Sequence, residues 1–547
     1  MKKTVFGILT IIVLVGTVVV IQLDRPTGAR GKSPAVPVSG ELPPEALLAQ
    51  DLALSDPGVI ALTTGRRSEV FSVAQTGNQY TEASRVCASA DCRQVDIYNF
   101  DENVLIAAIV DVEARRVLDV LVMPGVLPAG NDRLREVAVQ AIMDSPEVKA
   151  QLGWVPTRED IYLNPSSLLG TDCGYIHPCL GAIFPTGERF LWAHVDLTTE
   201  TFAGISWTDA PEDGEFVEFI PNGGCPAPGE VNQMGWELSY SVTPSDGLRV
   251  DGVTYNGIPF ITSAKLAEWH VAYTGGSGFV DAIGCGSGGS KFPIFPYGDT
   301  QVINLFDPGL NLIGFEVIQD FRMSQWGSTC NYRYEQHFQF FQDGRFRVVG
   351  GAYGKGCGTD GTYRPLIRID IAAGGDENDR FAIWDGAAWT NQLVEFWTLQ
   401  DETVTPEGFA WRVKDTVEDY GFYIEPGQGQ FEDSGRGDDA FVYVVSHKAS
   451  EGDVDMSAIG SCCNNNFQQG PHTYINGESI NGENIVLWYV PQFVTVVDES
   501  PVNYYCWTVS GEPSPETYPC FGGPMFHPFG FLTELEFNIF APLIIRD

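Results

Sequence analysis

The stretch Thr329-Cys330-Asn331-Tyr332-Arg333-Tyr334, with the residues that follow it as far as Val349, has the clearest structural pattern of the chain. From Asn331 to Phe341 the side chains alternate in type. One face of an extended segment would carry Tyr332, Tyr334, Gln336, Phe338 and Phe340, and the other would carry Arg333, Glu335, His337 and Gln339. This period-two alternation of aromatic residues predicts a half-buried β-strand. Gln342-Asp343-Gly344 supplies an Asp-Gly turn, so Arg345 to Val349 is predicted to return as the second strand of a hairpin.

The composition extends this prediction to the whole chain. With 547 residues the protein is too long for one ordinary core, and we expect two to four domains. The 60 glycines and 34 prolines indicate many short strands and turns, which is typical of a mainly β protein. At 44% hydrophobic and 12% aromatic residues, the chain can bury a large interior.

The charge is strongly acidic, with 71 acidic against 32 basic residues and a formal net charge of −39. Such a charge argues against nucleic acid as a partner, because the phosphate backbone selects basic surfaces. It is compatible with cationic partners such as amines, or with a simple role in solubility.

The N-terminal residues are predicted to form a targeting signal. Lys2 and Lys3 precede an uncharged run from Thr4 to Leu23, which is long enough to span a bilayer as a helix. We favour a membrane signal-anchor over residues 1–23 with the rest of the chain outside the cytoplasm, and a cleaved signal peptide of a secreted protein is the alternative. Residues 24–43 are rich in Pro, Gly, Ser and Ala and are predicted to form a flexible stalk.

Twelve cysteines agree with an oxidising compartment. Two local pairs, Cys87–Cys92 and Cys173–Cys179, are plausible loop disulfides, and the connectivity of the others cannot be deduced from sequence. A zinc site is weakly supported, because the chain contains no Cys-x-x-Cys pair.

Before the aromatic hairpin the sequence predicts small α+β modules. Residues 44–54 read as a short helix, residues 104–112 and 117–123 as a hairpin, and Asn131 as the N-cap of a further helix. We therefore predict one α+β accessory domain over residues 44–153 and a second, compressed one over residues 154–224.

Several motifs resemble the copper amine oxidases. The Asn331-Tyr332 dipeptide, followed by Phe-x-Phe-x-Gln-Asp-Gly over residues 338–344, is similar to the segment in which that family oxidises a tyrosine to topaquinone. The resemblance identifies Tyr332 as the quinone precursor beside Asn331, although the acidic residue that usually follows is Arg333 here. Further similar segments are residues 235–244, 247–259, 266–273, 482–489 and 525–531, and the motif of residues 122–153 resembles an accessory domain of the family.

The resemblance also implies a fold and roles for other residues. It predicts a large antiparallel β-sandwich of catalytic type over residues 225–547, preceded by one or two cystatin-like α+β domains, in a homodimer. Tyr273 matches the tyrosine that hydrogen-bonds the quinone. Asp281 matches the catalytic base, a role that requires a buried carboxylate with a raised pKa.

The copper ligands that the family requires are missing from the sequence. The resemblance implies a His-x-His pair on one strand and a third histidine downstream, but the seven histidines of this chain include no such pair. The matching stretches are Gly361 to Arg364 and Phe493 to Thr495, and neither contains histidine. We expect His337 to be a structural histidine, and no metal-ligating residue is predicted. The family also has a peripheral calcium site. This chain retains only Asp370 of that site, with Glu483 as a possible further residue.

Two functions follow from these observations. The first is a membrane-tethered, extracytoplasmic copper-amine-oxidase-like protein that has lost copper and catalysis, without a cofactor, and acts as a binding or structural module, with small cationic amines as candidate ligands. The second is an active primary-amine oxidase with non-standard copper ligands and topaquinone at Tyr332. It would convert an amine, O2 and water to an aldehyde, ammonia and hydrogen peroxide.

Overall fold

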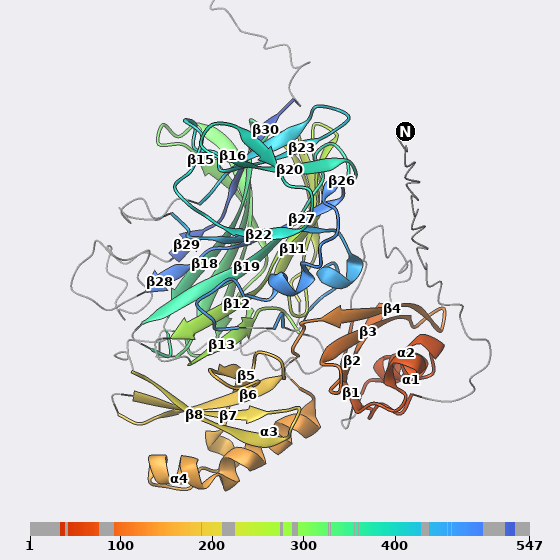
Figure 1. Ribbon diagram of the computed structural model, residues 1–547, viewed down its shortest axis with the longest axis vertical. Coiled ribbons are helices and arrows are strands. Elements are labelled where there is room, and N and C mark those ends of the chain that lie inside the picture. Colours follow the sequence, from red (N-terminus) through yellow and green to blue (C-terminus); the bar gives the residue numbers. More distant parts are fainter. Residues whose placement is uncertain are drawn as a thin grey trace, which may run out of the picture.

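The computed structural model describes most of the chain, and Figure 1 shows it as a ribbon. The described residues are 33–38, 42–75, 92–128, 130–187, 189–209, 225–273, 277–286, 294–326, 328, 330–354, 356–358, 360–427, 437–456, 458–460, 462–495 and 520–530. Two small modules lie beside one end of a large sandwich of β-sheets (Figure 1). The predicted transmembrane segment 1–23 lies outside the described residues.

The first module is a four-stranded antiparallel sheet in the order β1-β2-β3-β4 with two helices against it. Asp56 caps the second helix with its side chain, and Pro57 fixes the first helical residue. The elements are α1 (Pro44–Leu54), α2 (Pro57–Thr63), β1 (Ser68–Gln75), β2 (Cys92–Asn99), β3 (Val104–Asp111) and β4 (Arg116–Pro124). The predicted first helix and the hairpin over residues 104–123 are confirmed.

The second module consists of two helices packed on four antiparallel strands. Asn131 caps α3 by accepting a hydrogen bond from the Leu134 amide, as predicted. The helices α3 (Asp132–Asp144) and α4 (Pro146–Leu152) contact the sheet of this module, and the predicted domain boundary at residue 153 falls between them and that sheet. The remaining elements are η1 (Arg158–Asp160), β5 (Leu163–Leu168), β6 (Cys179–Pro185), β7 (Arg189–Asp196) and β8 (Thr201–Asp209).

One sheet of the sandwich includes fourteen strands among the described residues, because β13 pairs with β5 and joins the second module to it. Its central strands run in the order β22-β25-β27-β19-β12-β13. Its strands besides β5–β8 are β9 (Gly229–Gln233), β10 (Trp236–Val242), β11 (Leu248–Tyr255), β12 (Ile258–Tyr273), β13 (Ser277–Ala282), β19 (Gly361–Ile371), β22 (Phe396–Leu399), β25 (Phe441–Ser446), β27 (Ile485–Val490) and β28 (Phe493–Thr495).

The other sheet of the sandwich includes twelve strands among the described residues, and the aromatic hairpin lies within it. Its strands are β14 (Ile294–Pro296), β15 (Gln301–Phe306), β16 (Leu312–Met323), β17 (Arg333–Phe341), β18 (Phe346–Gly354), β20 (Asp379–Trp384), β21 (Trp389–Asn391), β23 (Trp411–Asp415), β24 (Gly421–Glu425), β26 (Asn481–Glu483), β29 (Cys520–Gly522) and β30 (Met525–Phe529). Two short 3-10 helices, η2 (Ala449–Glu451) and η3 (Pro471–Tyr474), lie in the connections.

The predicted hairpin forms the β17–β18 pair, and its alternation decides which side chains enter the main hydrophobic core. Tyr334, Phe338 and Phe340 point into the main hydrophobic core. Residues from both sandwich sheets share this core, among them Trp236, Phe260 and Phe422. The protein is therefore mainly β, with a large antiparallel sandwich and small α+β modules, as predicted.

Two further features concern the predicted N-terminal organisation. Residues 33–38 fall within the predicted stalk, yet Val36 bridges to Glu69 of β1 and Ala35 is buried against the first module. Within the part of the chain that the structure describes, the helices are too short or too polar to cross a membrane.

Candidate functional site

Tyr332 lies immediately before β17 and is almost completely buried. Its carbonyl accepts a hydrogen bond from the Met323 amide at 2.9 Å, which extends the β16–β17 pairing. A disulfide between Cys330 and Cys357 joins the approach to Tyr332 to the chain that follows β18. The segment that carries Tyr332 is thereby covalently linked to the chain after β18.

The hydroxyl group of Tyr332 forms a hydrogen bond with that of Tyr273, the last residue of β12. The amide of Cys357 donates to both oxygens, at 2.8 Å each, and the hydroxyl of Tyr363 lies 3.4 Å from that of Tyr273. Burial is the largest cause that raises the pKa of Tyr273 and of Tyr332 well above the usual value. Near neutral pH these phenols therefore stay protonated. We refer to Tyr273, Tyr332 and Tyr363 as the tyrosine cluster.

Sheet register and glycine explain why the cluster forms here. Antiparallel pairing of β12 with β19 places Tyr363 opposite Val271, two residues before Tyr273. The loop after β18 closes over these rings because it contains glycine. A Cβ atom on Gly356 would lie 2.5 Å from the Tyr363 hydroxyl, and one on Gly358 would lie 2.6 Å from the Tyr273 ring.

Asp281, on β13, reaches the cluster through Tyr334. The hydroxyl of Tyr334 donates to Asp281 Oδ2 at 2.6 Å, and the Tyr334 ring stacks on those of Tyr332 and Trp269. Burial raises the pKa of Asp281 to about 7, although the hydrogen bond from Tyr334 opposes the shift. Asp281 is thus a buried carboxyl group with a raised pKa, which is a property that a general base requires. The part played by Tyr334 was missed, although its position two residues after Tyr332 places it on the same strand face.

The structure therefore brings three of the four predicted site residues, Tyr332, Tyr273 and Asp281, into one buried group. The fourth, Asn331, is partly buried and lines a cavity beside this group. Their predicted roles are not tested by this placement.

The positions expected for copper ligands lie next to the tyrosine cluster. Pairing of β19 with β28 sets Gly361 opposite Thr495 and Tyr363 opposite Phe493. Thr495 Oγ1 donates to the Gly361 carbonyl oxygen at 3.0 Å. Tyr363 supplies a phenol, Thr495 a hydroxyl group and Gly361 only backbone atoms at these positions. The residues present therefore do not fit a copper site with histidine ligands.

The histidines on neighbouring strands have other partners. His270 Nε2 lies 2.6 Å from Glu268, and His337 lies between Glu316 and Glu335, with nitrogen–oxygen distances of 3.0 Å. Burial lowers the pKa of His337, but the hydrogen bonds that the two carboxylates accept from its ring, together with their charges, outweigh burial and raise the pKa. His337 is thus tied into the sheet as the sequence predicted.

Arg333, the departure from the family motif, is also held by acidic groups. Its guanidinium pairs with Asp320 and Glu335 and lies 4.1 Å from the Tyr353 ring centre and 4.9 Å from that of Trp326. It therefore faces away from the tyrosine cluster, on the opposite face of β17.

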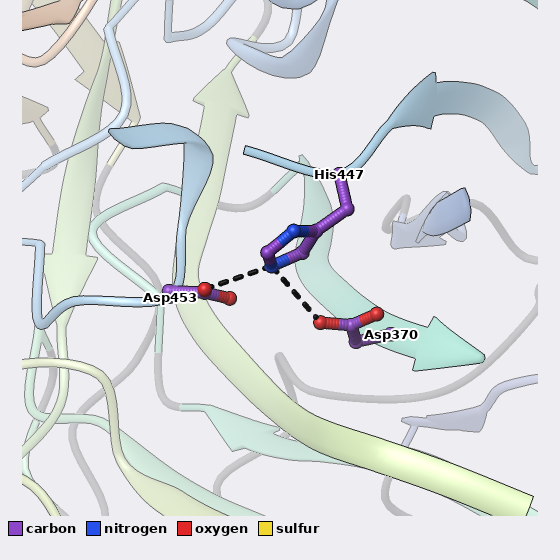
Figure 2. A group of neighbouring side chains, drawn as sticks. All are labelled: Asp370, His447 and Asp453. Atoms are coloured by element: carbon purple, nitrogen blue, oxygen red, sulfur yellow. Dashed lines mark hydrogen bonds and ion pairs between the residues drawn. The ribbon is translucent and has the colours of Figure 1, made fainter. Parts of the chain in front are cut away.

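A second group of potential metal ligands is formed by Asp370, His447 and Asp453 (Figure 2). His447 Nε2 lies 2.8 Å from Asp453 and 3.4 Å from Asp370. Arg368 supplies a positive charge to the same carboxylates, at 2.8 Å from Asp453 and 3.5 Å from Asp370. Glu483, the possible further residue of the partly matched calcium site, is exposed on β26 opposite Asp379. A guanidinium thus lies close to the carboxylates of Asp370 and Asp453, which could bind a cation.

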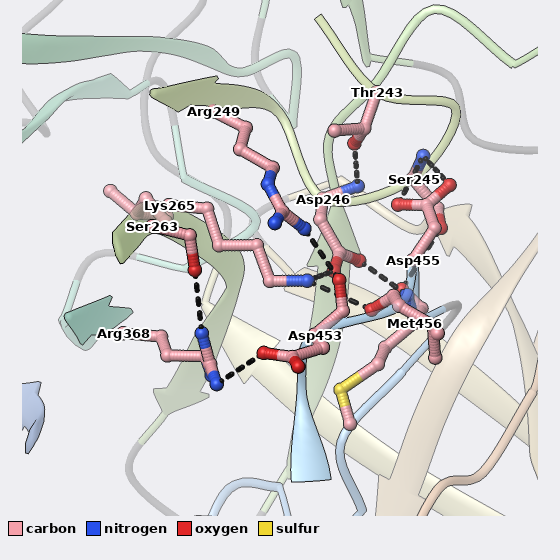
Figure 3. Close-up of polar contacts among 12 residues, drawn as sticks. Thr243, Ser245, Asp246, Arg249, Ser263, Lys265, Arg368, Asp453, Asp455 and Met456 are labelled. Carbon is pink, nitrogen blue, oxygen red and sulfur yellow. Dashed lines mark hydrogen bonds and ion pairs between the residues drawn. The ribbon is translucent and has the colours of Figure 1, made fainter. Parts of the chain in front are cut away.

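Beside this group, a buried charge network fixes the chain after η2 to the sandwich (Figure 3). Lys265 pairs with Asp246, and its Nζ donates to the Val454 carbonyl at 2.9 Å. Asp246 also accepts from the Met456 amide, and Arg249 donates to the Asp453 carbonyl. The segment fixed in this way leads to the Cys462–Cys463 disulfide, in which Cys462 Sγ lies 3.1 Å from the Phe279 carbonyl oxygen of β13.

The predicted Cys173–Cys179 disulfide is present. Cys87 lies outside the described residues, so the predicted Cys87–Cys92 pair is not placed. The pairs Cys225–Cys285, Cys330–Cys357 and Cys462–Cys463 could not be deduced from spacing. These bonds indicate an oxidising environment.

Comparison with solved structures relates the fold to amine oxidases. A copper-containing benzylamine oxidase from Hansenula polymorpha matches with a TM-score of 0.50 and 13% identity, over 89% of this chain and 96% of that one. A lysyl oxidase from Pichia pastoris has a TM-score of 0.46 and 10% identity over 92% of each chain. For an amine oxidase from Aspergillus nidulans the values are 0.44 and 12%, over 85% of this chain and 84% of that one.

No protein-family model matches the chain, and no curated protein is significantly similar to it in sequence. At these identities the similarity concerns the fold alone. The protein has an amine-oxidase-like β-sandwich fold.

Proposed function

We propose that this chain is a copper-amine-oxidase-like protein in which Tyr332 remains a tyrosine, and that it acts as an extracytoplasmic binding or structural module. The donor set around Tyr332 carries this proposal. The stretches that match the copper-binding strands supply Gly361, Tyr363 and Thr495, and Tyr363 joins a hydrogen-bonded group of phenols. Copper supplies the oxidising chemistry of quinone formation in the family, and imidazole donors for it are not found among the described neighbours of Tyr332.

The electrostatics of the cluster support the same proposal. Tyrosine binds a metal ion as phenolate. Burial raises the pKa of Tyr332 and of Tyr273 well above the usual value and so disfavours this form. The carboxyl group of Asp281 contributes a smaller effect in the same direction, since a negative charge nearby disfavours phenolate. The group is therefore better suited to hold the fold together than to bind a cation.

Localisation and assembly remain predictions. The disulfides support an extracytoplasmic body, and the apolar run over residues 1–23 supports a single-pass anchor. A homodimer and binding of small cationic amines rest on the family resemblance. The pKa of Asp281 is about 7, so its carboxyl group is only partly ionised at neutral pH. It would therefore attract a cationic amine less strongly than a fully ionised carboxylate does.

The alternative is an active primary-amine oxidase. The proximity of Tyr332, Tyr273 and Asp281 favours it, because a buried carboxyl group with a pKa of about 7 is suited to general base catalysis.

Hydrogen peroxide release distinguishes the two functions. The full chain, incubated aerobically with Cu(II), is assayed with benzylamine beside an Asp281→Asn variant. The proposal predicts no peroxide above the variant's background. Peroxide release that Asp281→Asn reduces by a hundredfold or more would establish the oxidase instead.

A further inference from the structure

A cavity of about 570 Å³ lies between the second module and the sandwich. Its wall is formed by α3, by Arg158 and residues 161–164, by β6 and β7, and by residues 323–325, 330 and 331. Pockets that bind small organic molecules typically measure roughly 300–1,000 Å³. The cavity has the size of a ligand site and borders the residue that precedes Tyr332.

The charge of the cavity is opposite to that of the chain. Its charged lining residues are Arg135 and Arg158, and neither aspartate nor glutamate is among the described residues that line it. The chain as a whole has a net charge of −39. A positive hollow in so acidic a protein selects for anions.

Arg135 lines the cavity, and its guanidinium is only partly satisfied by hydrogen bonds to the described residues. Its Nη2 donates to the Leu163 carbonyl at 3.0 Å, while its Nη1 is buried without a hydrogen-bond partner among the described residues. Burial lowers the pKa of Arg135 to about 10 against the opposing charge of Asp132, so the side chain is still cationic at neutral pH. A buried donor left unsatisfied costs about 1–3 kcal/mol, and more when it is charged. A negative charge in the cavity that Arg135 lines would stabilise this buried cation.

Arg158 differs from Arg135 because it already pairs with Glu136 at the surface. It can attract an anion at long range, but its charge is already compensated by Glu136. Arg135 is therefore the residue that distinguishes an anion from a neutral molecule.

The rest of the wall is largely apolar, with Val139, Ile161, Phe190 and Met323 among its residues. We infer that the cavity binds a small amphipathic organic anion, whose carboxylate or phosphate group is held by Arg135 while its apolar part lies against Phe190 and Met323. This inference goes beyond the proposed function and holds whether or not Tyr332 is oxidised. It also opposes the charge of the amines that the family resemblance suggests.

Calorimetric titration of the full chain at pH 7.5 and low ionic strength tests the inference with four probes of one ring size. Benzoate and phenyl phosphate are expected to bind at least tenfold more tightly than benzyl alcohol and benzylamine. The tighter of the two anions identifies the head group. If neither anion binds, or if the alcohol or the amine binds as tightly, the inference is wrong.

Variants locate the binding. Arg135→Met should weaken anion binding at least tenfold while leaving the melting temperature equal or higher, because it removes an unpaired buried charge. Arg116→Gln, which makes a similar charge change at an exposed residue of β4, should bind as wild type does. Unchanged binding by folded Arg135→Met would overturn the inference. If that variant does not fold, Met323→Trp, which places a bulky ring in the cavity wall where the apolar part of the ligand would lie, should weaken binding of the tighter anion at least tenfold, and unchanged binding would overturn the inference equally.

Discussion

The hydroxyl groups of Tyr273 and Tyr332, which lie 59 residues apart in sequence, form a hydrogen bond inside the sandwich. Tyr273 ends β12 of one sheet and Tyr332 precedes β17 of the other. The Cys357 amide donates to both oxygens and closes the group. The bond therefore joins the two sheets at the place where the family resemblance expects a cofactor.

Removal of either hydroxyl should destabilise the fold. We predict that Tyr332→Phe and Tyr273→Phe each lower the free energy of unfolding by about 1–3 kcal/mol, because each leaves a buried partner unsatisfied. The double variant should lose less than the sum of the two, as measured by denaturant unfolding. Tyr162→Phe, at a side chain that is 79% exposed, is the control and should have little effect. Additive losses would show that the two hydroxyl groups are not coupled.

Asp281 should make stability depend on pH. Its carboxyl group has a folded-state pKa of about 7 against an ordinary value of 3.8, so the folded protein binds the proton more tightly. The stabilisation is complete below about pH 4 and is lost as the pH rises through 7. We predict that the stability of the wild type falls relative to that of Asp281→Asn between pH 4.5 and 8, measured by chemical denaturation. A constant difference would contradict the raised pKa.

The buried charge network should be sensitive to the loss of one partner. Lys265→Met leaves the buried carboxyl group of Asp246 without its ion-pair partner, and we predict a loss of roughly 3–5 kcal/mol in the free energy of unfolding. The exposed pair Arg345–Asp343 provides the comparison, since Arg345→Gln should change stability by less than about 1 kcal/mol. Equal effects of the two substitutions would show that burial does not decide the outcome.

The disulfides should differ in their contributions because they close loops of different length. Cys330 and Cys357 are 27 residues apart, and replacing both by alanine should cost roughly 3–4 kcal/mol through loop entropy. Cys462 and Cys463 are adjacent, so the same replacement should cost only about 1 kcal/mol by this effect. Thermal unfolding of both double variants measures the difference, and the reverse order would refute the entropic account.

Sequence predicted the local patterns and, through the family resemblance, the residues that meet at the centre. The alternation from Asn331 to Phe341 was sufficient for β17, and matching segments identified Tyr273 and Asp281. Tyr363 could not be placed in this group, because its position depends on the long-range register between β12 and β19.

Packing between modules was also beyond the sequence. The helix α3 follows the first sheet in the chain, but it packs on β5–β8, and no local pattern distinguishes these choices. For the same reason Arg135 could not be recognised as a cavity residue, since Met323 and Asn331, which line the cavity with it, come from distant parts of the chain.

The most direct test of the proposed function is mass spectrometry of the peptide that contains Tyr332, from protein refolded aerobically with Cu(II). The account predicts an unmodified tyrosine and no retained copper, because the positions next to the tyrosine cluster offer Gly361, Tyr363 and Thr495 instead of histidines. A mass gain at Tyr332 that corresponds to topaquinone, absent from Tyr332→Phe, would contradict it and establish a copper site of unexpected ligands.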